Sequence, residues 1–281
     1  MSEVPRETSV SVRQQQQQHA NLKRTDQDIK EAAKLWVRDP AAAETMYGHI
    51  SRWDTSAVTD MSELFHNARD FNEDLSNWMT ANVTTMSRLF QYSFSFNCDL
   101  SNWSTAAVTD MSYLFCDAHS FNCDLSNWNT AAVTNMSFLF TDAHSFNCDL
   151  SNWSTAAVTD MSHLFYGARS FNCDLSNWST AAVTDMRGLF AGARSFSCDI
   201  SLWNIYKVTD MYNVFLGCPV NFEAVWKERQ RLQRKRDENW ARRLPWMMVI
   251  SPFLRREGVT ESPLQVVFDV QGLFQLITSY L

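Results

Sequence analysis

Glycine and proline are scarce in this chain, with seven and six residues among 281. Average usage would give about 20 glycines and 14 prolines, so collagen-like proteins and loop-rich β-proteins built on glycine turns are excluded. Long apolar runs are also missing. No stretch of 18 apolar residues occurs and no signal-peptide segment opens the sequence, so we expect an intracellular protein without a membrane span. With 45% apolar residues, the chain is long enough to bury a substantial core.

Positive charge is scarce in the middle of the chain. Residues 47–222 carry seven basic and seventeen acidic side chains, whereas residues 223–281 carry ten basic and seven acidic ones. Because nucleic-acid affinity depends on clustered lysine and arginine, we expect no nucleic acid to bind the acidic middle. Residues 1–24 are polar and contain five consecutive glutamines, so we predict a disordered arm there.

A repeat of 25 residues fills the acidic middle. Columns of tryptophan, valine, methionine and phenylalanine recur at this period without a gap. The tryptophan column comprises Trp53, Trp78, Trp103, Trp128, Trp153, Trp178 and Trp203. Periods of 20–29 residues are typical of coils that combine one strand with one helix or turn. We therefore predict seven stacked coils over residues 47–222, with the aromatic side chains as their core.

One copy of the repeat, residues 96–120, predicts the local structure of a coil. Residues 100–105 suit a short strand in which Trp103 and Thr105 point inwards. A short helix is indicated by apolar residues at i, i+3, i+4 and i+7, with Thr109 or Asp110 as its N-cap; these apolar residues are Met111, Leu114, Phe115 and Ala118. The expected fold class is an α/β repeat solenoid whose coils each contain one short parallel strand and one short helix.

The repeat consensus Phe-Asn-x-Asp-Leu-Ser-x-Trp-x-Thr-x-x-Val-Thr-x-Met-Ser-x-Leu-Phe resembles the BspA-like leucine-rich-repeat family of bacterial surface proteins and lipoproteins. The resemblance covers about Tyr47 to Phe222, and residues 29–36 with Tyr47-Gly48-His49-Ile50 are similar to what precedes such repeats. It implies a leucine-rich-repeat-like solenoid used for adhesion or protein contacts, without a conserved catalytic function. Unlike the bacterial members, this sequence shows no signal peptide, lipobox cysteine or wall anchor, so surface display is not expected.

Both ends of a coil stack need covers, because an open coil exposes its core and its edge. Residues 25–46 predict an N-terminal capping helix, with Thr25 as its N-cap and a break at Asp39-Pro40. Residues 223–281 predict a basic helical C-terminal cap. Its docking residues are expected to be Val225, Trp226 and Trp240.

Two other interpretations of the C-terminal segment remain open. The basic run Arg234-Lys235-Arg236 is compatible with a nuclear-localisation signal or with binding to an acidic partner. Residues 266–281 faintly resemble the opening helix of an F-box, which would make the protein an adaptor. The apolar face of that helix would consist of Leu273, Leu276, Ile277 and Leu281.

The polar columns of the repeat predict structure rather than chemistry. The Asp99 column is expected to form turns, since the glycine-rich repeat of calcium-binding coils is absent. The cysteine column is expected to hold buried free thiols, because neighbouring coils lie farther apart than a disulfide prefers, with metal binding or disulfides as the alternative; it comprises Cys98, Cys123, Cys148, Cys173 and Cys198. No nucleophile–base pair, phosphate-binding glycine loop or zinc spacing occurs. We therefore predict a protein that is not an enzyme and that holds no metal or cofactor.

Two columns vary between copies while the rest of the repeat is fixed, and both are predicted to face solvent. Repeat proteins bind partners over an extended face, where tyrosine, phenylalanine and arginine are favoured contact residues. The predicted partner-binding residues are Arg88, Tyr113, Phe138 and His163 in one column, and Phe94, His119, His144, Arg169 and Arg194 in the other. The sequence thus predicts a non-catalytic protein–protein interaction scaffold, centred on Tyr113 and Phe138.

Two alternatives to partner binding stay open at these positions. The variation between copies is also what neutral change on a solvent-facing surface would produce. Recognition of a glycan or an ice lattice by a regular polar face is the other alternative, with Asn102 and Thr105 and their equivalents as the polar residues. Inward-pointing Thr105 and the interrupting Ala106-Ala107 argue against that second alternative.

Overall fold

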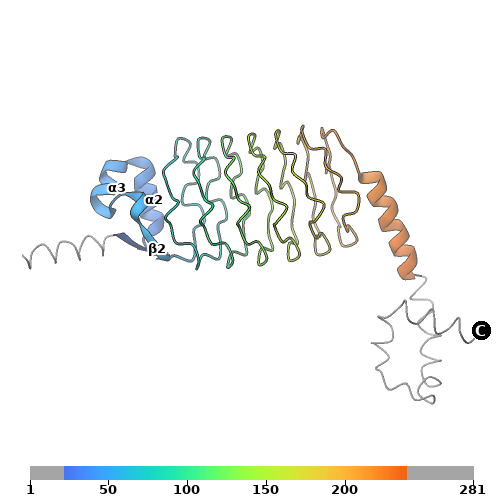
Figure 1. Cartoon of the computed structure of the whole chain (residues 1–281), viewed down its shortest axis with the longest axis horizontal. Coiled ribbons are helices and arrows are strands. Elements are labelled where there is room, and N and C mark those ends of the chain that lie inside the picture. Colours follow the sequence, from blue (N-terminus) through green and yellow to red (C-terminus); the bar gives the residue numbers. More distant parts are fainter. Residues whose placement is uncertain (1–21, 239–281) are drawn as a thin grey trace, which may run out of the picture. The chain divides into compact units, whose positions relative to one another are not determined.

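The structure is a computed structural model that describes residues 22–238 (Figure 1). The chain divides into two compact units, Met1–Trp226 and Lys227–Leu281. The first unit contains the repeats. Most of the predicted arm at residues 1–24, the F-box-like segment at residues 266–281 and the expected docking residue Trp240 lie outside the described residues.

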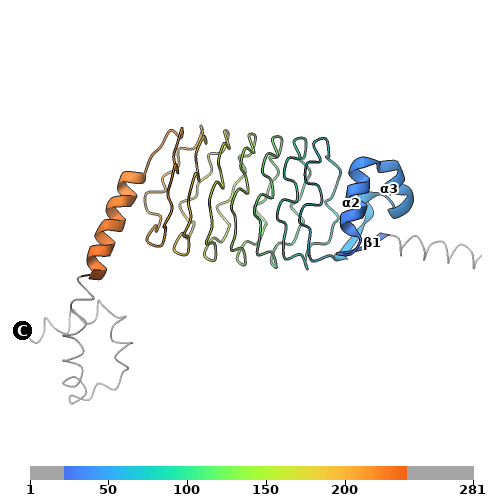
Figure 2. The ribbon, with the colours of Figure 1, turned by 180° about the vertical axis from the view of Figure 1, so that it is seen from behind.

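Two short helices cover the N-terminal end of the repeats (Figure 2). Helix α2 spans Ile29–Arg38 and buries one side against the first coil, with Ile29, Ala32, Ala33 and Trp36 in the core. Helix α3 spans Pro40–Tyr47, and its N-cap Asp39 accepts a hydrogen bond from the N–H of Ala42. Proline at the first position of α3 ends α2 and starts α3, because it lacks an N–H and its φ suits a helix start.

Thr25 is not the N-cap that the sequence predicts. It ends strand β1 (Lys23–Thr25), which pairs in parallel with β2 (Asp54–Ala57), ahead of α2; the 3-10 helix η1 (Ile50–Arg52) precedes β2. The expected cap fails because the N–H of Thr25 donates to Asp28 in a turn between β1 and α2. Asp26 in this turn accepts hydrogen bonds from the N–H groups of Thr59 and Asp60, at 2.8 and 3.0 Å. The Asp26 carboxylate thereby supplies acceptors that a preceding coil would otherwise provide.

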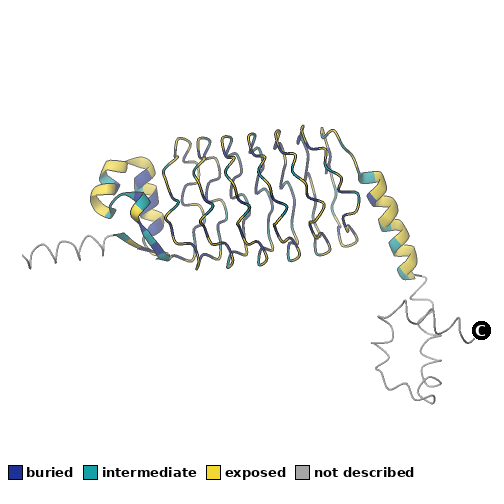
Figure 3. Cartoon of the chain, in the orientation of Figure 1, coloured by how far each residue is buried: buried dark blue, intermediate teal, exposed yellow. Residues whose placement is uncertain are grey.

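The seven 25-residue units lie side by side as coils, which we number 1 to 7, each running from one tryptophan to the residue before the next (Figure 1). Their apolar columns form one continuous core. Buried residues alternate with exposed ones along every coil (Figure 3). Rings of the tryptophan column stack in parallel, as in the 6.3 Å separation of Trp128 and Trp153. Each indole N–H also donates to a backbone carbonyl, that of Trp153 to Leu125 at 3.1 Å.

Coil 1 contains strand β2, but the helix and the strand expected within each coil are absent over residues 78–222. Residues 112–117 form successive turns, because Tyr113 and Asp117 adopt left-handed φ values of 58° and 59° that a right-handed helix does not allow. Residues 100–105 alternate in burial as expected, but the parallel bridges between coils lie elsewhere, at Asp110 and its equivalents. Asp110 caps no helix; its carboxylate accepts from the N–H of Ser112.

Backbone hydrogen bonds join each coil to the next, mostly in one direction. The N–H groups of Met86, Arg88, Phe90 and Tyr92 donate to carbonyls of the following coil at 2.9 to 3.0 Å. In the opposite direction, the N–H of Thr84 donates to the carbonyl of Thr59. Within the described residues, the four equivalent forward N–H groups of coil 7 have no acceptor; these belong to Met211, Asn213, Phe215 and Gly217.

A helix begins after the last coil, over residues 223–238. Within the first unit, Trp226 is fully buried, stacks on Trp203 at 6.1 Å and donates its indole N–H to the carbonyl of Ile200. Trp226 thus extends the tryptophan column by one ring. Val225, expected to dock beside it, is 47% exposed, because adjacent helical positions point in directions about 100° apart and only one of them faces the coil.

Candidate functional site

The first variable column, which we call the central column, consists of residues with a left-handed backbone. Their φ values run from 54° to 64°. Such values cost an ordinary residue free energy unless the surroundings impose them. In coils 1 to 6 the N–H at this position donates to a carbonyl of the following coil, which holds the backbone there. The column comprises Glu63, Arg88, Tyr113, Phe138, His163, Gly188 and Asn213.

Side chains of the central column stack on one another from coil to coil. The ring centres of Tyr113 and Phe138 are 4.4 Å apart, and those of Phe138 and His163 are also 4.4 Å apart. The guanidinium of Arg88 lies 5.2 Å from the centre of the Tyr113 ring and pairs with Glu63 at 3.2 Å. Because the ring faces cover each other, the three rings are half-buried. A partner would meet their edges.

The second variable column, which we call the flanking column, forms a similar stack over coils 1 to 4. Arg69 lies 5.3 Å from the centre of the Phe94 ring, and Phe94 stacks on His119 at 4.7 Å. His119 stacks on His144 at 4.6 Å. The last two members, Arg169 and Arg194, are exposed and make no ring contact within the described residues.

Two carboxylates accompany the histidines of the flanking column. Asp117 lies 3.6 Å from His119, and Asp142 lies 3.4 Å from His144. Burial lowers the pKa of His144, and the nearby positive charge of Arg169 adds to this effect. Burial likewise lowers the pKa of His163, beside Arg187. The imidazoles of His144 and His163 are therefore neutral at neutral pH, and stacking rather than ion pairing holds them in place.

The structure brings most of the predicted site residues together as two ladders on the coil stack. Sequence reasoning did not foresee the left-handed backbone that carries the central column. The available signal was the residue types at the two left-handed positions of the repeat. The central column contains Gly188 and Asn213, and the position four residues later contains Asn67, Asp117 and Gly167. These are the residues that adopt positive φ most readily.

Comparison with protein families finds one matching description, the Mycoplasma protein of unknown function, DUF285. It matches twice, over residues 40–147 and 123–226, which together span about two thirds of the chain. The chain belongs to this family. No curated protein and no solved structure matches it. The two overlapping matches follow from the internal repetition of the DUF285 segment.

The cysteine column of the DUF285 repeats holds free thiols that are half-buried rather than buried, because this column lies at the edge of the core. The Cys123 thiol contacts the side-chain and backbone oxygens of Asn97 in the preceding coil, both at 3.2 Å. Burial raises the pKa of Cys98 and Cys173 to about 11 and that of Cys123 to about 12. These thiols are protonated at neutral pH and are weak nucleophiles.

The aspartate column performs the turn-forming role that the sequence predicts. Asp99, for example, accepts a hydrogen bond from the N–H of Ser101 at 2.8 Å, and this bond lowers its pKa. Among residues 22–238, no cluster of three histidine, cysteine or acidic side chains is placed to hold a metal ion. No described helix is long and apolar enough to span a membrane.

The polar lattice proposed for glycan or ice recognition is not formed by the threonines. Thr105 and its equivalents Thr80, Thr130, Thr155 and Thr180 are at most 2% exposed. Each hydroxyl is directed to the following coil, as when Thr130 donates to the carbonyl of Ser154 at 2.9 Å. The threonines therefore add no exposed hydroxyl groups to the face that carries Asn102.

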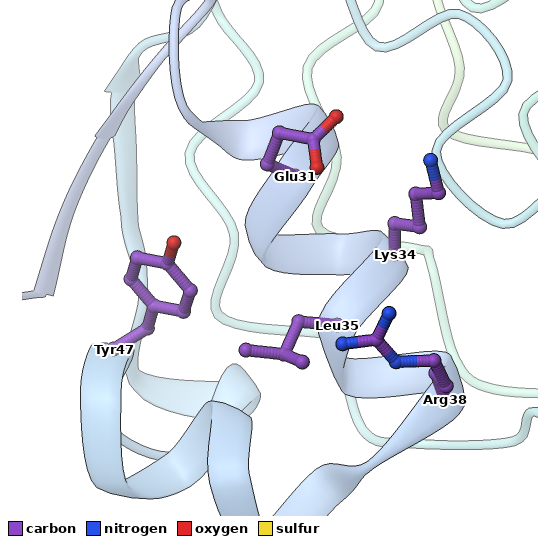
Figure 4. A pocket seen from close by; sticks show the side chains of 5 residues that line it. All are labelled: Glu31, Lys34, Leu35, Arg38 and Tyr47. Atoms are coloured by element: carbon purple, nitrogen blue, oxygen red, sulfur yellow. The ribbon is translucent and has the colours of Figure 1, made fainter.

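A shallow depression of about 200 Å³ lies on the N-terminal cap (Figure 4). Its walls are Glu31, Lys34, Leu35 and Arg38 of α2, with Tyr47 at the end of α3. A larger one, of about 500 Å³, lies between α2 and residues 67–73 of coil 1. Neither contains a pairing of nucleophile and base, and only Arg69 belongs to the variable columns.

Proposed function

We propose that the protein is a non-catalytic scaffold that binds another protein through the central and flanking columns. In this proposal the coil stack is a leucine-rich-repeat-like solenoid of the BspA-like type, located inside the cell. Membership of a repeat family of unknown function is consistent with it. The observation that carries the proposal is the stacking of Arg88, Tyr113, Phe138 and His163, which places an exposed arginine and three half-buried rings in one continuous row.

A rigid row of this kind suits recognition. Each ring is held by its neighbours at 4.4 Å, so little side-chain entropy remains to be lost when a partner binds. Tyrosine and arginine are enriched among residues that dominate binding energy. A partner would gain contact area without having to order the surface first.

The test is affinity capture with the full chain tagged in its own cells. The double variant Tyr113→Ala/Phe138→Ala removes the centre of the row, and we expect it to lose the protein that the wild type captures reproducibly. The matched control is Met79→Ala/Tyr206→Ala, which removes two exposed side chains outside both columns and should retain that protein. Undiminished capture by the first variant, with circular dichroism equal to wild type, would refute the row as the binding site.

A further inference from the structure

The acidic residues that accompany the flanking column stop after coil 4. Asp117 and Asp142 stand two residues before His119 and His144 and lie beside them. In coils 5, 6 and 7 the same position is glycine, and the backbone stays left-handed, with φ of 64°, 74° and 70°. We call this row of three, Gly167, Gly192 and Gly217, the glycine lane.

The flanking column changes to arginine where its carboxylates disappear. Arg169 and Arg194 stand two residues after Gly167 and Gly192, and both are exposed. Among the described residues, neither guanidinium has a carboxylate within ion-pair distance, whereas Arg187 of coil 6 pairs with Asp185 at 2.8 Å. Two neighbouring coils of an acidic stack therefore present uncompensated positive charge.

The glycine lane is open above Gly192 and Gly217. A Cβ built on Gly192 would meet only the backbone of Gly167, at 3.4 Å, and one on Gly217 only the backbone of Gly192, at 3.9 Å. Above Gly167 the space is taken by the carboxylate of Asp142. Two exposed apolar side chains lie next to the lane in the sequence. Tyr166 precedes Gly167 and is 41% exposed, and Leu216 precedes Gly217 and is 60% exposed.

We propose that the glycine lane and the arginines Arg169 and Arg194 bind an acidic, extended segment of a protein partner. This inference rests on the proposed function, since it names the chemistry of the partner at one end of the same face. Guanidinium groups pair well with carboxylates, and a floor of glycine lets a peptide backbone approach closely. Carboxylates on alternate residues of an extended peptide lie about 6.6–6.8 Å apart, a separation that two long arginine side chains on adjacent coils span.

A nucleic acid is the less favoured ligand for this patch. Residues 47–222 carry seventeen acidic side chains against seven basic ones, so a phosphate backbone extending beyond coils 5 and 6 would meet like charge. A short acidic peptide matches the two coils that carry the unpaired arginines and needs no further basic residues.

Fluorescence anisotropy with the full chain tests the proposal. The probe is a labelled short peptide in which glutamate alternates with serine, and its counterparts are the same peptide with glutamine and a short oligothymidylate. We expect the glutamate peptide to bind, the glutamine peptide to bind more weakly, and the affinity to fall as salt is raised. The double variant Arg169→Gln/Arg194→Gln should lower the affinity for the glutamate peptide about fivefold to thirtyfold. Equal binding of both peptides, or tighter binding of the oligothymidylate, would overturn the proposal.

Two substitutions at one glycine separate charge from shape. Gly192→Asp places a carboxylate in coil 6, two residues before Arg194, at a position where Asp117 and Asp142 show that aspartate accepts this backbone. We expect it to neutralise Arg194 and to weaken binding of the glutamate peptide about fivefold. Gly192→Asn fills the same space without charge, as Asn67 does in coil 1, and should weaken binding less than Gly192→Asp does. The loss that the two variants share measures the close approach of the peptide, and the additional loss in Gly192→Asp measures the charge. Wild-type affinity in Gly192→Asp contradicts the proposal.

The outcome here is separable from that of the proposed function. Tyr113→Ala/Phe138→Ala leaves the glycine lane and both arginines intact, so we expect it to bind the glutamate peptide as the wild type does. Should the peptide fail to bind while this variant still loses its cellular partner, the acidic-segment inference falls and the scaffold proposal stands. Should the peptide bind while the variant still captures its cellular partner, the acidic-segment inference stands and the central column is not the binding site.

Discussion

Replacing Thr155 by valine removes one part-buried hydrogen bond between coils while keeping the shape of the side chain. Thr155 is 1% exposed, and its hydroxyl donates to the carbonyl of Ser179 in the next coil at 2.9 Å. Valine retains the branch at Cβ and therefore the same rotamer preference. In the variant the Ser179 carbonyl loses its donor. The substitution thus isolates what one such bond contributes to the junction between two coils.

The expected loss of stability follows from the burial of the Thr155 side chain. A net hydrogen bond contributes about 1 kcal/mol to stability, and a buried acceptor without a donor costs about 1–3 kcal/mol. We expect Thr155→Val to lower the free energy of unfolding by about 1–2 kcal/mol, or the Tm by roughly 2–8 °C. Steric strain does not enter, because coil 7 has Ile205 at this position, 3% exposed. Among residues 22–238, no coil follows coil 7 to accept a hydroxyl bond there.

Urea denaturation followed by tryptophan fluorescence measures the effect, with Thr159→Val as the matched control. Thr159 lies in the same coil, and its hydroxyl also donates to a neighbouring coil, to the Thr134 carbonyl at 3.2 Å, but this threonine is exposed. Water replaces that bond, so we expect a change within about 0.5 kcal/mol. Equal losses in the two variants, or a gain in stability from Thr155→Val, would refute the reasoning.

Two further predictions concern pH and thiol reactivity. Burial alone would raise the pKa of Asp26, but hydrogen bonds from Thr59 and Asp60 outweigh it and lower the pKa. Asp26→Ala should therefore lower the free energy of unfolding by about 1 kcal/mol near neutral pH. The difference in stability between this variant and the wild type should shrink as the pH falls below about 4. A difference that persists in acid would contradict a stabilising role for the charged Asp26 carboxylate. With the pKa of Cys98 and Cys173 raised to about 11, iodoacetamide at mildly alkaline pH should alkylate them about a hundredfold more slowly in the native chain than in urea. Mass spectrometry of both samples measures this, and similar rates would contradict the burial of the thiols.

The sequence predicted which residues are buried better than how the backbone buries them. The apolar set at Met111, Leu114, Phe115 and Ala118 is fully buried, as a helical face would be. The backbone reaches this burial through turns with left-handed residues at Tyr113 and Asp117. A pattern of apolar residues reports only which side chains point inwards, and both conformations satisfy it. The choice is made by hydrogen bonds between coils, which a single repeat does not reveal.

The candidate site was predictable in position and not in its contacts. Variation between copies marks the central and flanking columns as outward-facing. That Tyr113 and Phe138 cover each other's faces depends on how the rings turn between adjacent coils, which the repeat period does not specify. Arg169 and Arg194 appear in the sequence as two more variable residues. Their unpaired charge becomes visible only when the structure places Asp117 beside His119 and Gly192 in the equivalent place in coil 6.

The direction of the backbone hydrogen bonds gives the repeat unit two chemically different ends. Coil 7 presents a row of four N–H donors, at Met211, Asn213, Phe215 and Gly217, without acceptors among the described residues. Two copies that met at this end would set donor against donor, so a symmetric dimer cannot form through these rows. A whole coil inserted between two others would meet matching partners on both sides. The length of the stack can therefore change by duplication or loss of 25-residue units, while every junction keeps its bonding.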